Sequence, residues 1–145
     1  MAIQTVFGSG AQYLLDTVNY TSAGTYKLAL MSSVYQTHAT SKHSHVFWSD
    51  CSASQITGQT WQSIGAVSLS KVTSDSKVYF KSATTQVTFA SVGGSQPCGG
   101  VVVFRDTSVA GTSELIASLE WTASTTNGQN WVVSLNANGI ASFTY

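Results

Sequence analysis

Short segments in which apolar and polar residues alternate run along almost the whole chain, and this pattern constrains the fold more than any other feature. The segments are rich in β-branched and aromatic residues and are separated by Gly, Asn and Ser. Alternation with a period of two is typical of strands, whereas helical periodicity hardly occurs here. Strands at intervals of about 8 to 12 residues favour a sandwich or a small barrel. The sequence therefore predicts an all-β protein, with a jelly-roll-like two-sheet antiparallel β-sandwich of roughly eight or nine strands as the preferred architecture.

The individual strands can be placed from the alternation. The predicted strands are Thr25–Met31, Val46–Trp48, Ile64–Val72, Lys77–Lys81, Gln86–Ala90, Val101–Arg105, Leu115–Trp121, Trp131–Leu135 and Ile140–Tyr145. Val101–Arg105 is a continuous apolar run, which suits a central strand. The odd-numbered residues from Leu115 to Trp121 are expected to share one side. Asn127-Gly128 is the strongest short turn signal in the chain, and the glycine-rich Ser91–Gly100 is expected to be a flexible connection between two strands.

Length and charge limit both the domain organisation and the surface. A chain of 145 residues suits one domain, so we expect a single β-sandwich over residues 1–145, in which residues 1–16 belong to the domain or form an N-terminal arm. Charged residues make up 8% of the chain and the net charge is zero, whereas about 25% charged residues is usual. A surface of hydroxyl and amide groups opposes association little, which indicates permanent assembly with other proteins.

Several classes of partner are disfavoured by the same composition. The basic residues are scattered and matched by acids, so nucleic acid is not an expected partner. No stretch approaches the roughly 18 consecutive apolar residues of a membrane helix, and no charged and then apolar leader for export is recognisable. Without such a leader, Cys51 and Cys98 are expected to be free thiols, although one disulfide between them stays open.

The residues that could carry chemistry are few. His38, His43 and His45, with Asp50 and Cys51 close behind, form the tightest cluster of candidate metal ligands, since two of these histidines would share one face of a strand. Histidines in a polar loop are mostly solvated, and we therefore predict no metal and no cofactor.

Catalytic arrangements are weaker still. Asp106 and Glu114 flank one loop, but turn or salt-bridge roles are the default for such acids. The chain contains the serines, histidines and aspartates that a Ser/His/Asp triad needs, but no Gly-x-Ser-x-Gly elbow is present. The stretch Gly93–Gly100 lacks the lysine of a phosphate loop. The sequence therefore predicts a protein that is not an enzyme.

The aromatic residues are the remaining candidates for a binding site. Four tryptophans are many for one small domain. We expect two or three of them to fill the core and the others to lie at a subunit contact, where Trp and Tyr are enriched. Exposed tryptophans that stack on sugar rings, as in carbohydrate-binding modules, are the alternative. The candidate interface residues are Trp48, Trp61, Trp121 and Tyr13.

Several segments, taken in order, resemble a family of small virion structural proteins of tailed bacteriophages and cyanophages, and the resemblance extends over most of the chain. The segments that carry it are Gly24–Met31 (GTYKLALM), Ser49–Asp50, Gln55–Trp61 (QITGQTW), Gly65–Leu69, Val102–Thr107, Glu114–Ala117, Asn127–Gly128 and Asn136–Ile140. Trp61 stands where a tyrosine is more usual in the family, and Ala66 replaces a glycine. None of these segments carries catalytic chemistry.

The resemblance implies a component of the virion rather than an enzyme. Its first implication is a capsid cement or decoration protein that binds the major capsid protein over contacts between capsid subunits, as a homotrimer by analogy with other decoration proteins. Such a protein would be synthesised in the bacterial cytoplasm and located on the capsid surface. A tail, neck or fibre-attachment component and a carbohydrate-binding module for attachment to the host surface are the alternatives.

Overall fold

The computed structural model describes residues 3–6, 25–33, 35, 44–65, 67–72, 77–136 and 141–144. The strands in this part of the chain are β1 (Ile3–Val6), β2 (Thr25–Ser32), β3 (Gln62–Ser63), β4 (Val67–Val72), β5 (Lys77–Ser82), β6 (Gln86–Val92), β7 (Pro97–Asp106), β8 (Leu115–Thr125), β9 (Gln129–Ser134) and β10 (Ala141–Thr144). Three short 3-10 helices join them: η2 (Trp48–Asp50), η3 (Ser52–Ser54) and η5 (Ala110–Thr112). No helix in these residues is long and apolar enough to cross a membrane. The all-β prediction is confirmed.

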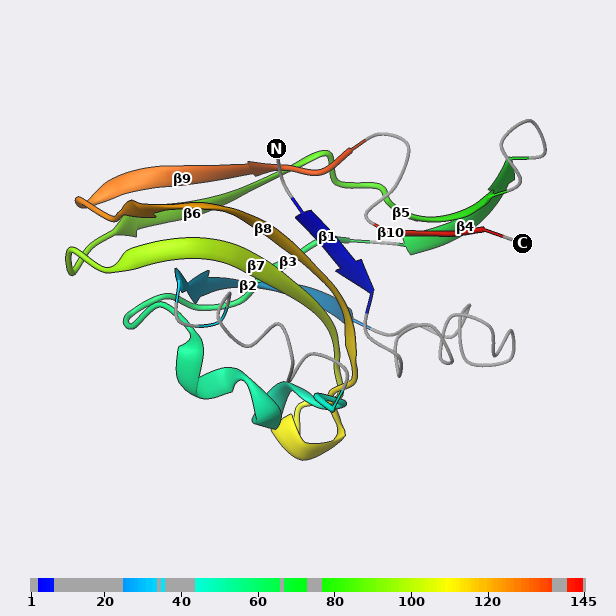
Figure 1. Ribbon diagram of the computed structural model, residues 1–145, viewed down its shortest axis with the longest axis horizontal. Coiled ribbons are helices and arrows are strands. Elements are labelled where there is room, and N and C mark those ends of the chain that lie inside the picture. Colours follow the sequence, from blue (N-terminus) through cyan, green and yellow to red (C-terminus); the bar gives the residue numbers. More distant parts are fainter. Residues whose placement is uncertain are drawn as a thin grey trace.

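The strands form two layers (Figure 1). One layer is a five-stranded antiparallel sheet with the order β1-β8-β7-β2-β3. The other consists of the pair β6–β9 and the three-stranded sheet β10-β5-β4. Because β5 leads into β6 and the Leu135 N–H donates to the Thr85 carbonyl at 2.8 Å, these two pieces follow one another along the same layer. The result is a sandwich whose second layer is interrupted in the middle.

Strand β7 is the centre of the structure, as its apolar run predicted. It lies third in the five-stranded sheet, and its residues from Cys98 to Phe104 are all buried. A strand that is apolar on both faces needs cover on both faces. Alternate residues accordingly enter two cores: Val101 and Val103 face one, and Val102 and Phe104 face the other.

The main core lies between the two layers. Its residues come from the five-stranded sheet, from β5, β6 and β9, and from the connecting residues Ile56, Ile64 and Leu135. They are Tyr26, Leu28, Leu30, Ile56, Ile64, Phe80, Val87, Phe89, Val92, Cys98, Val101, Val103, Ile116, Ala117, Val133 and Leu135. Val87 and Phe89 point inward because alternate residues of a strand share a face. The Tyr26 and Phe80 rings meet edge to face with centroids 5.4 Å apart, which joins β2 to β5 across the core.

The second core lies on the opposite face of the five-stranded sheet, under the cover segment, which we define as residues 44–61. It consists of Ala29, Met31, Tyr35, Trp48, Cys51, Val102, Phe104 and Leu115. The cover segment contains η2 and η3, and the Val46–Trp48 strand expected there is reduced to one bridge between Phe47 and Glu114. Trp48 is therefore buried from a short helical turn, η2, rather than from a strand, and its indole lies between the cover segment and the sheet.

Two local predictions were wrong. Pro97–Gly100 is not a flexible connection but the start of β7, and Gly99 and Gly100 are buried. The odd-numbered residues of β8 were expected to face the same side. Leu115 instead lies in the second core, whereas Ala117 lies in the main core. The cause is a register shift between Val103 and Phe104 in the β7–β8 pair, which is a bulge that reverses the facing of β8.

Candidate functional site

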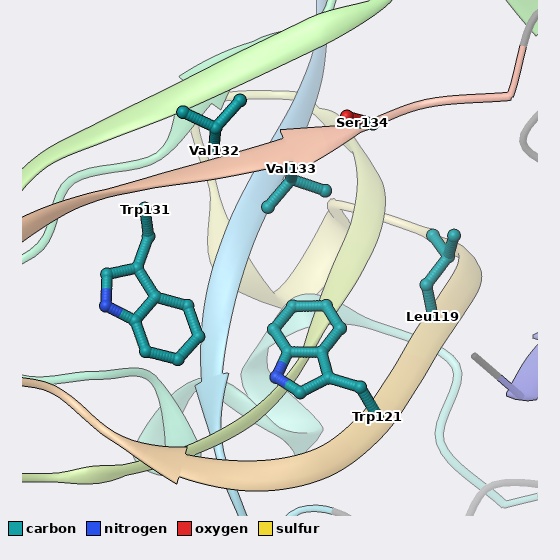
Figure 2. Close-up of a pocket in the computed structure, with 6 residues that line it drawn as sticks. All are labelled: Leu119, Trp121, Trp131, Val132, Val133 and Ser134. Carbon is teal, nitrogen blue, oxygen red and sulfur yellow. The ribbon is translucent and has the colours of Figure 1, made fainter. Parts of the chain in front are cut away.

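A hollow opens on the side of the sandwich between β8 and β9, and two tryptophans form its walls (Figure 2). Trp121 rises from β8 and Trp131 descends from β9, with ring centroids 6.3 Å apart and planes inclined by 31°. The hollow has a volume of about 220 Å³ and is lined by Leu119, Trp121, Trp131, Val132, Val133 and Ser134, which we call the tryptophan groove. Both indoles are half-buried and rest on the main core.

Two different features of the strands position these side chains, namely alternation in β9 and a bulge in β8. Trp131 and Val133 point to the same side of β9, because they are two residues apart. Trp121 is placed by a bulge: Cys98 pairs with Ser124 and Gly100 with Glu120, so three residues of β8 stand opposite one residue of β7. Bulges commonly re-aim side chains next to binding sites, and this one begins at Trp121.

The groove is left open by the strand pairing. Among the described strands, β1 pairs with β8 over residues 117–120, and β9 pairs with β6 alone. The part of β8 beyond Glu120 therefore extends past the end of β1, and β9 forms the border of its layer. No described strand bridges the gap between them, which is why the tryptophan rings are accessible.

A polar trough continues the groove toward the tip of the β8–β9 connection. It has a volume of about 330 Å³ and is lined by Ser124, Thr125, Asn127, Gln129, Asn130, Trp131 and Val132, the last two of which it shares with the tryptophan groove. Asn130 Oδ1 accepts the Ser91 N–H at 2.9 Å, which ties the trough to β6. Thr126 is buried beneath the trough, where its Oγ1 donates to the Gly93 carbonyl at 2.9 Å and accepts the Gln96 N–H at 2.8 Å.

The described segments at this end of the molecule carry no charged residue. Residues 82–104 and 121–136 contain no Asp, Glu, Lys or Arg, and the fold brings them together as β6, the first half of β7, the end of β8 and β9 (Figure 1). The charges near the other end include the Arg105–Glu114 ion pair at 3.6 Å. The tryptophan groove and the polar trough are thus neutral along their whole lining.

A second aromatic surface lies on the other face of the five-stranded sheet. Trp61 is 38% exposed and meets Phe104 and Trp48 edge to face, with ring centroids 5.4 and 6.1 Å away. Its Nε1–H donates to Gln55 Oε1 at 3.3 Å, which fixes the indole on the cover segment. Val46 and Val109, which are 36% and 58% exposed, lie on the same face, since η5 packs beside η2. We call Val46, Trp61 and Val109 the cover surface.

The predicted interface residues separate into different environments. Trp48 is 2% exposed and stacks on Phe104 at 4.7 Å, so it is a core residue and its assignment as a partner contact is corrected. Trp61 and Trp121 lie on opposite faces of the five-stranded sheet and do not form one site. Tyr13 lies outside the described residues. Trp131 was not among the predicted interface residues, although it was one of the four tryptophans for which sugar stacking was the alternative; it lies in β9, soon after the Asn127-Gly128 turn.

The candidate metal and acid residues have structural roles where they are described. His38 and His43 lie outside the described residues, which contain no group of three or more His, Cys, Asp or Glu side chains that could hold a metal. Asp106 Oδ1 accepts the Ser108 N–H at 2.8 Å in a turn, and Glu114 pairs with Arg105. These are the default roles predicted for the two acids.

The exposed Asp50 of the cover segment and the buried thiols Cys51 and Cys98 have pKa values that are shifted by their surroundings. Partial burial raises the pKa of the Asp50 carboxyl, but hydrogen bonds from the Phe47 and Val46 N–H groups outweigh it and bring the pKa below its ordinary value. Burial, and then the charge of Asp50, raise the pKa of the Cys51 thiol to about 12. Burial raises the pKa of Cys98 to about 11. Both cysteines are free, buried thiols in separate cores and are unsuited to nucleophilic chemistry.

No protein-family model, curated protein or solved structure matches the chain. Inference about function therefore depends on the chemistry of the tryptophan groove, the polar trough and the cover surface.

Proposed function

We propose that this protein is a non-enzymatic structural component of a bacteriophage virion, and specifically a capsid decoration protein that binds over contacts between major capsid subunits. The resemblance of its ordered segments to small virion proteins supports the class. The observation that carries the choice is the cover surface, where Val46, Trp61 and Val109 are exposed on one face. A partly exposed tryptophan is a common anchor at protein interfaces.

The physical properties of the cover surface fit a contact that is repeated many times. Trp61 is held in place by Phe104, Trp48 and Gln55, so binding would lose little side-chain freedom at that residue. The low overall charge of the chain keeps the cost of removing water from polar groups small. Copies linked as a homotrimer would add avidity, so each cover surface needs only a modest affinity.

Adding the protein back to capsids tests this proposal. Purified protein is mixed with phage capsids stripped of it, and the particles are imaged by cryo-electron microscopy. Ordered density over capsomer junctions, with the cover surface turned toward the shell, is the expected result. Bare shells with density on tails or necks would move the protein to another part of the virion, and bare particles throughout would refute a virion role.

A matched pair of substitutions tests the face used. Val109→Ser lies on the cover surface, whereas Val132→Ser lies on β9 in the other layer, and the two side chains are almost equally exposed at 58% and 56%. We expect Val109→Ser and Trp61→Ala to lower capsid occupancy and Val132→Ser to leave it unchanged. Loss of occupancy with Val132→Ser alone would show that the capsid contact lies on the other face.

A further inference from the structure

We propose that the tryptophan groove and the polar trough together bind a neutral oligosaccharide built of pyranose rings. This site lies on the opposite face of the five-stranded sheet from the cover surface, so it is independent of the capsid contact. A particle decorated through the cover surface would leave the groove available to a glycan of a cell surface.

The two indoles supply the apolar half of the site. Trp121 and Trp131 lie side by side across the groove with planes inclined by 31°, and they form two walls of a shallow trough rather than a closed stack (Figure 2). The faces of a pyranose ring carry C–H groups that pack against the electron-rich face of an indole. Leu119 and Val133 also line the groove, so a sugar ring lying over the indoles would meet a continuous apolar surface.

The polar trough supplies the other half. A sugar ring carries hydroxyl groups around its edge, and each must keep a hydrogen bond when it leaves water. Amides donate and accept at once, which matches a hydroxyl in either direction. Asn127, Gln129 and Asn130 present such amides, and Ser124 and Thr125 add hydroxyl groups, all from exposed positions beside the groove.

The lining also determines the charge of the ligand. The residues that line the groove and the trough include no acid and no base, and residues 82–104 and 121–136 around them are uncharged. A sialylated, phosphorylated or amino sugar would lose hydration without gaining an opposite charge. The site therefore selects a neutral glycan.

Size and composition favour a glycan over other occupants. The two hollows share Trp131 and Val132 and measure about 220 and 330 Å³, near the lower limit of the roughly 300–1,000 Å³ of sites that enclose a drug-sized ligand. An elongated hollow of this size suits a short run of sugar rings lying across the surface. A protein hot spot would be apolar and dry at its centre, whereas here amide and hydroxyl side chains make up about half of the lining residues.

Calorimetry and tryptophan fluorescence with defined sugars test the proposal. The probes are maltohexaose, cellohexaose, N-acetylchitohexaose and mannohexaose, with oligogalacturonate as the acidic control. We expect at least one neutral hexaose to give saturable heat and to change the indole emission, and oligogalacturonate to give neither. Trp131→Ala should weaken that binding about tenfold or more, because it removes one stacking wall.

Matched variants separate the site from the rest of the molecule. Trp61→Ala removes an exposed tryptophan on the other face and should leave sugar affinity unchanged. Gln129→Ala, at an exposed position, should weaken binding severalfold even if Trp131→Ala fails to fold. Absence of binding by all four neutral hexaoses at millimolar concentrations, or equal affinity of wild type, Trp131→Ala and Gln129→Ala, would overturn the proposal. Normal capsid occupancy by Trp131→Ala would show that the glycan site is separate from the capsid contact. The failure of one proposal would then leave the other standing.

Discussion

Replacing Gly100 with alanine should destabilise the protein, because β8 approaches β7 too closely for any side chain at this position. A Cβ built on Gly100 would lie 2.6 Å from the Leu119 carbonyl oxygen, 3.4 Å from the Glu120 Cα and 3.5 Å from its Cγ. The nearest atom belongs to the backbone of a paired strand, so no rotation of a side chain can relieve the contact. The two strands must move apart at the bulge that places Trp121.

The size of the effect follows from two opposing contributions. Overpacking a close contact typically costs about 1–3 kcal/mol, and a clash with backbone belongs in the upper part of that range. Alanine also restricts the unfolded chain, which stabilises the folded state by about 0.4–1 kcal/mol. The expected net loss is about 1–2 kcal/mol, which for a domain of this length lowers Tm by roughly 5 °C.

Urea unfolding followed by circular dichroism measures the change, with Gly111→Ala as the matched control. A Cβ at Gly111 would meet nothing within 4 Å, and no positive φ restricts that residue, so Gly111→Ala should be neutral or slightly stabilising. If the midpoint of Gly100→Ala equals that of Gly111→Ala, the close approach of β8 does not constrain the fold and this reasoning is refuted.

Three further experiments test the cover segment and the two cores. Phe104→Ala, which removes the ring stacked on Trp48 at 4.7 Å, should lower the free energy of unfolding by about 3–5 kcal/mol in urea titrations. Asp50→Asn should destabilise the protein at neutral pH. Because the folded pKa of Asp50 is lowered, that difference should disappear as the pH falls below the ordinary value of 3.8; a constant difference would contradict it. Cys51 and Cys98 should resist a thiol reagent at pH 8 and react after denaturation, and rapid native labelling would show that they are accessible.

Patterns that depend on one strand at a time could be predicted from the sequence. The apolar run from Val101 to Phe104 indicated a central strand, and this prediction is confirmed. The predicted strand Gln86–Ala90 is likewise found in β6, where Val87 and Phe89 are buried. These features follow because a buried face of a strand consists of apolar residues, which can be recognised from the sequence of that strand alone. The jelly-roll connectivity stays a prediction, since alternation does not specify which strands pair.

Features that depend on two strands at once could not be predicted. The bulges in the β7–β8 pair reverse the facing of Leu115 and place Trp121, yet no residue in β8 marks them. Gly99 and Gly100 were interpreted as a flexible link, whereas Gly100 is required for the close approach of β8. Trp48 is buried by the cover segment, which folds back over the sheet. The sequence pattern that predicted a strand at Val46–Trp48 did not indicate this contact. In each case the partner segment, and not the local sequence, decides the environment.

The separation of the two surfaces follows from the way β7 is buried. Because its neighbours cover it on both faces, alternate side chains of one strand support different structures: Phe104 holds Trp61 and Trp48 on one face, while Val101 and Val103 pack into the main core against which Trp121 and Trp131 rest. A protein with one core presents aromatic side chains over that core alone. Here the second core under the cover segment supports a second aromatic surface, so the proposed capsid contact and the proposed glycan site lie on opposite faces of the five-stranded sheet.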